Sequence, residues 1–460
     1  MTRTNSLKKF ILLLGDIAIL YAVLFLVVMG RYYGTPDQDI LFFHLVPFTI
    51  LFAVWVGVFA ALQLYDLRLL INSKHFLYRL VRAMTTNGIL AIAFLYLLPF
   101  WEIEPRRNLL LIIAGATILL FLWRFFFNLI AIRARAHQVL FLGLTKEIEE
   151  FAAYLQKNPQ LGHRPVGFLV TAAETPLPLG GFPHYRIDDN LASVVRETDA
   201  DTIVISSESK ENKILVRLLF QVIPLGVVVV EFPHFHELLT GKIPASLLRE
   251  IWFVENLIGI RKQYYEFVKR AIDISLAALL SIPSLLLFPL IAAAIKTSSE
   301  GPIFYRQKRV GRHGQIFKII KYRSMVNNAD KIGGFKEHNR DGGSDPRITR
   351  VGMALRKTYL DELPQLLNIF KGEMSFVGPR PERPEFVEEL KQKIPFYEMR
   401  LLVPPGISGW AQINMENDAS VEDAPEKLQY DLYYIKNRAP ILDLLIMIRT
   451  FFIVLRREGR

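Results

Sequence analysis

The chain has 460 residues, of which 52% are hydrophobic, and its mean hydropathy of +0.27 is typical of a membrane protein. Its formal net charge of +11 indicates an anionic partner. Because long apolar segments are present and no nucleic-acid motif is found, lipid and phosphorylated substrates are favoured over nucleic acid. The absence of cysteine excludes disulfides, thiolate metal sites and a cysteine nucleophile.

Four apolar segments at the start of the chain predict a four-helix transmembrane module over residues 1–135. Each segment is close to the roughly 20 residues that cross a bilayer as a helix. The segments are 10–29, 41–64, 84–100 and 109–130. Lysine and arginine are in excess before the first segment, between the second and third, and after the fourth. The positive-inside rule therefore places the N-terminus and everything after Arg133 in the cytoplasm.

Short β-branched runs alternate with helical stretches over residues 136–240 and predict a Rossmann-like α/β domain. Buried parallel strands are expected at 139–143, 166–170, 202–206 and 226–231. After the first strand a single glycine, Gly143, stands where a dinucleotide site needs three. We therefore expect a structural or regulatory domain, with nucleotide binding as the alternative.

Residues 241–268 are expected to form a connector, and a fifth apolar segment follows at 269–297. Two prolines interrupt this segment, and an interior proline removes a backbone hydrogen bond and kinks a helix. A full crossing, the alternative, would also carry the basic run at 306–323 away from the α/β domain. We therefore expect a re-entrant membrane helix hairpin whose break lies near Ser281 and Pro283.

An α-rich catalytic domain is expected over residues 298–440, organised around the adjacent acids Asp361 and Glu362. Pro364 favours the first turn of a helix here, and a helix N-terminus carries partial positive charge that suits anionic side chains. Acids in a first turn can also be simple helix-start residues, which is the structural alternative to catalysis. The predicted fold class is thus a membrane protein of α plus α/β type.

Basic residues on both sides of the two acids indicate phosphate binding. The stretch 305–325 contains no acidic residue, so it attracts phosphate groups of a nucleotide or of lipid. A rigid Pro-Arg-Pro turn holds Arg380 in one orientation, which suits bidentate phosphate contacts. The candidate phosphate-binding residues are Arg380, Arg323, Lys321, Arg347 and Arg309. Arg347 can instead pair with Asp345.

Two further segments flank the expected site. The glycine-rich stretch 333–343 predicts a loop beside the site. Residues 441–460 combine an apolar run with terminal arginines and predict an interfacial helix lying on the membrane. The alternative for this last segment is an ordinary amphipathic core helix.

Five short motifs follow one another in the second half of the chain: GPIFYRQ (301–307), KYRSM (321–325), DPRIT (345–349), LDELPQ (360–365) and GPRP (378–381). Their order is that seen in bacterial sugar transferases. From about Lys269 onward the chain closely resembles the large monotopic phosphoglycosyl transferases, of the polyprenyl-phosphate hexose-1-phosphate transferase type. The N-terminal half resembles them more loosely.

The resemblance implies that Asp361 attacks the sugar-linked phosphate of a UDP-sugar and that Glu362 binds Mg²⁺. UMP leaves, and undecaprenyl phosphate accepts the hexose-1-phosphate from an aspartyl-phosphosugar, which starts capsule, exopolysaccharide or O-antigen synthesis. The residues alone permit these roles, but they do not decide which of the two acids is the nucleophile and which binds Mg²⁺. The resemblance also implies the bacterial inner (cytoplasmic) membrane, a site facing the cytoplasm, and a homodimer. The family's re-entrant helix breaks at a Ser-Pro pair, whereas Ser281 and Pro283 are not adjacent.

Three other functions fit parts of the sequence. A membrane-bound nucleotide-sugar dehydratase or epimerase would explain the Tyr-x-x-x-Lys match at Tyr265 and Lys269, but the dinucleotide glycines are missing after Leu142. A polytopic sugar-phosphate transferase would carry its acids in loops between many spans. A non-enzymatic membrane scaffold of polysaccharide export, or a chain-length regulator, leaves the two acids and Arg380 unexplained.

Overall fold

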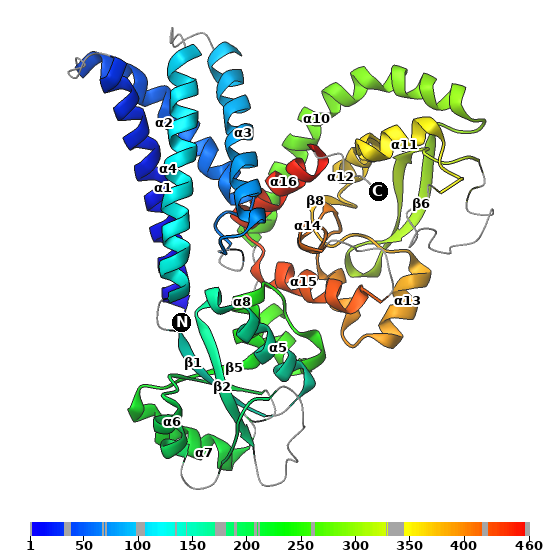
Figure 1. Cartoon of the computed structure of the whole chain (residues 1–460). Helices are drawn as coiled ribbons and strands as arrows, with labels where there is room; N and C mark the ends of the chain where they lie inside the picture. Colours follow the sequence, from blue (N-terminus) through cyan, green and yellow to red (C-terminus); the bar gives the residue numbers. More distant parts are fainter. Residues whose placement is uncertain are drawn as a thin grey trace. The chain divides into compact units, whose positions relative to one another are not determined.

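The computed structural model divides into two compact units, Met1–Leu239 and Thr240–Arg460 (Figure 1). The first unit holds the N-terminal helices and a parallel sheet, and the second holds one long apolar helix and the predicted catalytic residues. The residues that the structure describes are 2–31, 38–66, 69, 71–97, 106–133, 136–143, 145–170, 181–187, 191–206, 209, 212–258, 263–327, 329, 345–415 and 422–455.

Four helices form the first part of unit 1 (Figure 1). They are α1 (Thr2–Arg31), α2 (Gln38–Ala61), α3 (Lys74–Leu97) and α4 (Arg106–Arg133). Three of them contain stretches long and apolar enough to cross a membrane, at Leu7–Arg31, Phe42–Ala61 and Asn108–Ile130. Within the described residues α3 does not qualify, because it begins at Lys74, well before the apolar segment expected at 84–100, and its first turns are polar. Residues 98–100 of that segment lie outside the described part.

A buried ion pair joins two of these helices. Arg124 of α4 and Asp16 of α1 are both buried and directly paired, and Arg124 Nη1 also donates to the carbonyl oxygen of Leu64 at 2.6 Å. The guanidinium lies 5.5 Å from the ring of Phe59 and 5.0 Å from that of Tyr65. Ionised groups among apolar helices are stable only when paired in this way, so the pair fixes how α1 and α4 fit together.

Replacing Arg124 by Met is expected to lower the free energy of unfolding by about 3 to 5 kcal/mol, because Asp16 would be left buried without its partner. The double variant Asp16→Leu/Arg124→Met removes both charges and should recover most of that loss. Thermal unfolding in detergent, followed by tryptophan fluorescence, measures both. A double variant as unstable as the single one would show that the pair is not what links the helices.

The second part of unit 1 is a five-stranded parallel sheet in the order β3-β2-β1-β4-β5. The strands are β1 (His137–Leu142), β2 (His163–Val170), β3 (His184–Arg186), β4 (Thr202–Ile205) and β5 (Val228–Glu231). The helices of this part are α5 (Lys146–Lys157), η3 (Pro159–Leu161), α6 (Leu191–Thr198), α7 (Lys213–Val222), η5 (Ile223–Leu225) and α8 (Phe232–Thr240). The expected Rossmann-like domain is confirmed, since all strands are parallel and the order reverses beside β1.

Unit 2 begins with the segment expected to be a connector, which is folded into the core. It forms η6 (Ala245–Leu247), α9 (Glu250–Phe253) and the π-helix η7 (Val254–Ile258). Phe253 and Ile243 are buried together with Val387 and Leu428, from helices much later in the chain. The connector is therefore a structural part of unit 2.

The fifth apolar segment forms one continuous helix, α10 (Gln263–Ser298), which also qualifies as a candidate membrane helix. Pro283 and Pro289 lie inside it, and the ribbon changes direction along its length (Figure 1). Ser281 Oγ donates to the carbonyl oxygen of Ala277 at 2.7 Å within the helix. The expected break near Ser281 and Pro283 is thus replaced by a bent but unbroken helix, and the re-entrant hairpin is not confirmed.

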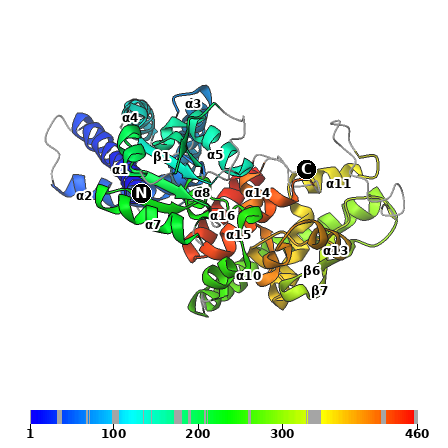
Figure 2. The same ribbon diagram turned by 90° about the horizontal axis from the view of Figure 1, so that it is seen from below.

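The rest of unit 2 surrounds a two-stranded antiparallel hairpin and a short parallel strand pair. The hairpin consists of β6 (Phe304–Val310), η8 (Arg312–Gly314) and β7 (Ile316–Tyr322), and the parallel pair of β8 (Ser375–Val377) and β9 (Gly406–Ser408). The helices are α11 (Arg350–Lys357), η9 (Leu360–Gln365), α12 (Leu366–Lys371), α13 (Pro384–Lys393), η10 (Tyr397–Leu402), α14 (Trp410–Asn414), α15 (Ala424–Asn437) and α16 (Pro440–Leu455). Helix α13 lies beside β6 (Figure 2). This part is rich in helix, and the stretch 333–343 lies outside the described residues.

The C-terminal segment is a helix with two different sides. In α16, Ile446 and Phe452 are buried, whereas Ile441, Leu444 and Phe451 are exposed. The exposed apolar positions recur at helical spacing, which is the pattern of a helix lying on a bilayer surface. Its placement on a membrane stays a prediction.

Candidate active site

The two acids lie in η9, a 3-10 helix between α11 and α12. Leu360 and Leu363 on one side of η9 pack with Ile291 and Ile295 of α10. This packing leaves Asp361 and Glu362 on the side away from that apolar cluster. The two acids, expected in the first turn of an α-helix, therefore lie in a short 3-10 helix whose apolar side packs against α10.

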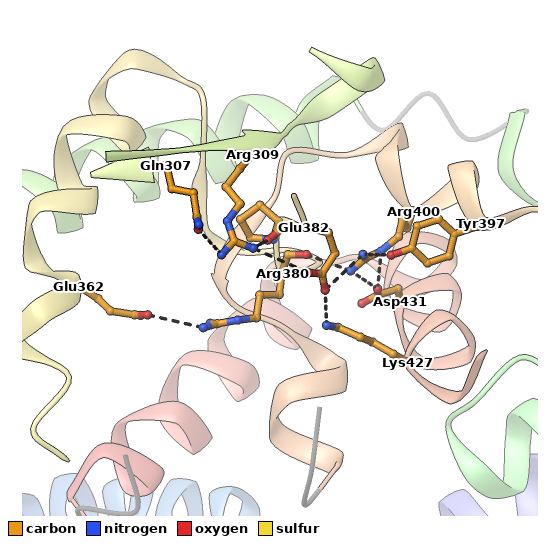
Figure 3. A network of polar contacts seen from close by, with 10 residues as sticks. Gln307, Arg309, Glu362, Arg380, Glu382, Tyr397, Arg400, Lys427 and Asp431 are labelled. Carbon is orange, nitrogen blue, oxygen red and sulfur yellow. Dashed lines mark hydrogen bonds and ion pairs between the residues drawn. The ribbon is translucent and has the colours of Figure 1, made fainter. Parts of the chain in front are cut away.

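Glu362 is held by two of the predicted phosphate-binding residues. Lys321 Nζ donates to Glu362 Oε1 at 2.6 Å. Arg380 Nη2 lies 3.8 Å from the same oxygen (Figure 3). Burial acts to raise the pKa of Glu362, but Lys321 and Arg380 outweigh it and lower that pKa below its ordinary value. Three predicted site residues therefore lie together in one charged cluster: Lys321 of β7, Glu362 of η9 and Arg380 of the Gly-Pro-Arg-Pro turn.

Asp361 is 8% exposed. Burial and the adjacent Glu362 raise the pKa of Asp361 to about 6, against the opposing charges of Lys321 and Arg356. Arg356, in the last turn of α11, also donates from Nε to Ser324 Oγ at 3.0 Å. Sequence reasoning missed Arg356, because nothing distinguishes it from the neighbouring basic residues of that helix. A raised pKa in a buried carboxyl beside cations marks Asp361 as a functional candidate.

If ionised Asp361 is required, kcat/KM should fall about tenfold for each pH unit below 6, because only the deprotonated carboxylate can attack. Arg356 lowers the pKa of Asp361, so Arg356→Met should move this acid limb to higher pH. Arg350→Met is the matched control, since Arg350 is an exposed arginine at the other end of the same helix. An acid limb that stays in place in Arg356→Met would contradict the assignment.

Arg347 and Arg323 have partners of their own. Arg347 donates from Nη2 to Asp345 Oδ2 at 2.8 Å and from Nε to Oδ1 at 3.0 Å, and these hydrogen bonds lower the pKa of Asp345 to about 2. Arg347 thus pairs with Asp345, as the alternative expected, and phosphate binding by Arg347 stays a prediction. Arg323 donates to the carbonyl oxygen of Ser299 at 2.7 Å, just past the end of α10. Its Nε and Nη1 are buried and have no hydrogen-bond partner among the described residues. Phosphate binding by Arg323 stays a prediction.

Arg309 lies behind the Pro-Arg-Pro turn. Its Nη1 donates to the carbonyl oxygen of Pro381 at 2.9 Å and its Nη2 to Gln307 Oε1 at 2.7 Å (Figure 3). Burial lowers the pKa of Arg309 to about 10, although Glu382 opposes the change, so the guanidinium is charged at neutral pH. Arg309 thus contacts the turn itself and, among the described residues, bonds to Pro381, Gln307 and Glu382 rather than to the acids of η9.

The Tyr-x-x-x-Lys match is structural. Tyr265 Oη donates to Asp443 Oδ2 at 2.8 Å, and Lys269 Nζ donates to the same oxygen at 2.9 Å. Tyr434 Oη donates to Asp443 Oδ1 at 2.9 Å. These bonds join the start of α10 to α15 and α16. The pair therefore links helices and does not resemble a proton-transfer site.

The carboxylates of η9 provide only some of the oxygen ligands that a hard metal ion such as Mg²⁺ needs. Among the described residues there is no group of three or more His, Asp or Glu side chains that could hold a metal ion. Mg²⁺ is commonly held by one or two carboxylates together with substrate phosphates, and Asp361 and Glu362 provide such a pair. Glu362 would have to exchange its bond with Lys321 for the metal.

Two segments of the chain match known domain families. Residues 264–457, which contain α10 and the acids, match the family described as bacterial sugar transferase. Residues 60–230, which contain the parallel sheet, match the family described as CoA-binding domain.

Three relatives match half of this chain or more. The UDP-N-acetylgalactosamine-undecaprenyl-phosphate N-acetylgalactosaminephosphotransferase of Aeromonas hydrophila is 42% identical, over 50% of this chain and 53% of its own length. The UDP-glucose:undecaprenyl-phosphate glucose-1-phosphate transferase of Xanthomonas campestris pv. campestris is 31% identical, over 70% of this chain and 67% of its own. The UDP-galactose-lipid carrier transferase of Erwinia amylovora is 32% identical, over 70% and 69%. The chain thus spans about half of the first relative and about two thirds of the other two.

Proposed function

The chain belongs to the bacterial sugar transferase family, and from this premise we propose that it transfers a hexose-1-phosphate from a UDP-sugar to undecaprenyl phosphate. UMP is released and a polyprenyl-diphosphate-sugar is formed, the first membrane step of a capsule, exopolysaccharide or O-antigen pathway. The observation that carries the proposal is the buried Asp361 next to the partly buried Glu362, which Lys321 and Arg380 contact. The three relatives are named for three different sugars, so the family leaves the sugar open.

In the proposed first step a carboxylate oxygen of Asp361 forms a bond to the sugar-linked phosphorus, and the bond from that phosphorus to UMP breaks. The pKa of about 6 leaves Asp361 mostly ionised at neutral pH. In the second step an oxygen of undecaprenyl phosphate attacks the same phosphorus and Asp361 leaves as a carboxylate. Arg380 and Lys321 would balance the charge on the phosphate oxygens in both steps.

Mg²⁺ fits this proposal as a ligand of Glu362, whose lowered pKa keeps it ionised. When bound, the ion would neutralise charge on the diphosphate of the donor. Lys321 would then be released from Glu362 toward the phosphate oxygens. Removal of Mg²⁺ with a chelator should stop UMP release and leave the fold unchanged, because Lys321 can again neutralise Glu362.

We further propose that α10 enters and leaves one leaflet and that the site faces the cytoplasm at the bacterial inner membrane. Ala277, in the first half of α10, is buried with Phe317 and Ile319, whereas Ile291 and Ile295 are buried with other side chains of the same unit. Two halves attached to one folded unit are difficult to place on opposite sides of a bilayer. The apolar residues between them are exposed and suited to lipid: Leu279, Ile282, Leu285, Leu286 and Leu290.

The test is UMP release from UDP-glucose, UDP-galactose and UDP-N-acetylgalactosamine by the purified full chain, with and without undecaprenyl phosphate and Mg²⁺. Release that requires one sugar and Mg²⁺ would support the proposal and name the donor. A stoichiometric burst of UMP in the absence of lipid acceptor would support the covalent intermediate. If a folded preparation releases UMP from no UDP-sugar, the proposed donor class is wrong.

A further inference from the structure

The turn that carries Arg380 is tightly held from the side of β9. Gly378 donates its N–H to the carbonyl oxygen of Ser408 at 2.9 Å, and Gly406 donates to that of Pro379 at 3.0 Å. A Cβ on Gly378 would lie only 2.3 Å from the carbonyl oxygen of Pro404. These contacts fix where the turn lies, but they do not touch the peptide groups that follow Arg380.

The next two carbonyl groups of the turn are each bound by a guanidinium. Arg400 Nη2 donates to the carbonyl oxygen of Arg380 at 3.0 Å, and Arg309 Nη1 donates to that of Pro381 at 2.9 Å. Both carbonyl groups therefore point toward these two guanidinium groups. The side chain of Arg380 extends the other way, toward Glu362 (Figure 3).

Arg400 is itself rigidly held. Its side chain is 2% exposed, its Nε donates to Asp431 Oδ2 at 3.0 Å, and its Nη2 lies 2.8 Å from the same carboxylate oxygen in an ion pair. Nη1 donates to Tyr397 Oη at 2.7 Å. Because a guanidinium is planar, these bonds together determine the plane in which it can meet the carbonyl oxygen of Arg380.

Glu382 balances the cations that meet behind the turn. Its carboxylate pairs with Lys427 Nζ at 2.5 Å and lies 3.8 Å from both Arg400 Nη1 and Arg309 Nη1 (Figure 3). Burial acts to raise the pKa of Glu382, but Lys427, Arg400 and Arg309 outweigh it and lower the pKa to about 2. Glu382 therefore stays ionised throughout the physiological pH range.

We infer that Arg400 is a positioning residue for phosphate binding: it holds the carbonyl group of Arg380 so that the Arg380 guanidinium faces Glu362 and the donor phosphate. The inference rests on the proposed function for the identity of the phosphate ligand. Arg400 does not touch the acids of η9, so its contribution to catalysis passes through Arg380. Lysine cannot replace it, because one ammonium group cannot form the same fork to Asp431, Tyr397 and a carbonyl oxygen.

A double-mutant cycle on the full-length protein tests this inference, using Arg400→Lys, Arg380→Ala and the double variant. Arg400→Lys alone should lower kcat/KM for UMP release by about 10- to 100-fold, as expected for a displaced substrate-positioning group. In the Arg380→Ala background the same change should cost less than about threefold, because the group that it positions is gone. If the fold losses in kcat/KM of the two single variants multiply in the double variant, the inference is overturned and Arg400 has a general structural role.

Two further measurements separate positioning from folding and from the proposed function. Tyr397→Phe removes one partner of Arg400 with little change in shape, so the same cycle with this variant applies if Arg400→Lys does not fold. The dissociation constant of inorganic diphosphate, measured for the same single and double variants, tests the inference without turnover. If Arg400→Lys weakens diphosphate binding only when Arg380 is present, while no UDP-sugar is turned over, the positioning role stands and the proposed donor is wrong. Lys393→Gln, at an exposed lysine of α13, is the control that should change neither quantity.

Discussion

Replacing Asp361 by Asn is expected to lower kcat by at least about 10⁴-fold, because an amide cannot form the covalent bond that the proposed mechanism requires. The substitution keeps the size of the side chain and removes its charge. Since burial and Glu362 already disfavour that charge, the folded protein should tolerate the change. UMP release, with the thermal unfolding midpoint measured alongside, checks both parts of this expectation.

The control for Asp361→Asn is Lys357→Gln, which removes a charge from an exposed residue at the end of α11. It should leave kcat within about twofold, as is usual for surface substitutions. A loss of less than tenfold in Asp361→Asn would mean that Asp361 serves only as a helix-start residue. The nucleophile would then have to be sought elsewhere, first at Glu362.

Replacing Gly378 by Ala is expected to lower the free energy of unfolding by about 3 kcal/mol, because the added methyl group has no room. It would lie 2.3 Å from the carbonyl oxygen of Pro404 and 2.9 Å from the backbone nitrogen of Gly406. Both neighbours are backbone atoms and cannot rotate away. Any relaxation must displace the turn that carries Arg380, so kcat/KM should fall even at temperatures where the variant remains folded. Thermal unfolding and UMP release measure the two effects.

Gly314→Ala is the control for Gly378→Ala. Gly314 lies at the tip of the β6–β7 hairpin, where no atom of the described residues lies within 4 Å of an added Cβ, but its φ of +80° disfavours a side chain. We expect a loss of about 1 kcal/mol and unchanged kcat/KM. If Gly378→Ala is no less stable than this control, the two strands β8 and β9 are less closely joined than their geometry indicates.

Features with a local pattern could be predicted from the sequence. Apolar length located α1, α2 and α4, and β-branched runs located four strands of the sheet, because both signals arise within single segments. Strand β3 was missed, since His184–Arg186 contains no β-branched residue. The short Asp361–Glu362 sequence and the Pro-Arg-Pro turn were found for the same reason: each is contained in a few adjacent residues.

Features that depend on distant contacts could not be predicted in this way. Prolines 283 and 289 predicted a broken helix, yet α10 continues through both, because its buried residues pack against η9 and the β-hairpin. The role of Arg400 could not be predicted from the sequence, because it depends on contacts with Asp431 and with the carbonyl group of Arg380, which lie far from it in the chain. Arg356 is likewise recognised only by its electrostatic effect on Asp361.

The packing of α10 against Leu360 and Leu363 has a kinetic consequence. In the proposed arrangement α10 is embedded in lipid, and its packing against η9 would keep the two acids at a constant height above the bilayer surface. The proposed acceptor, anchored by its hydrocarbon tail, would then reach them by lateral diffusion, so the relevant concentration would be its mole fraction in the membrane. Adding neutral phospholipid at a fixed amount of acceptor should therefore slow turnover, although the bulk concentration of every reactant is unchanged.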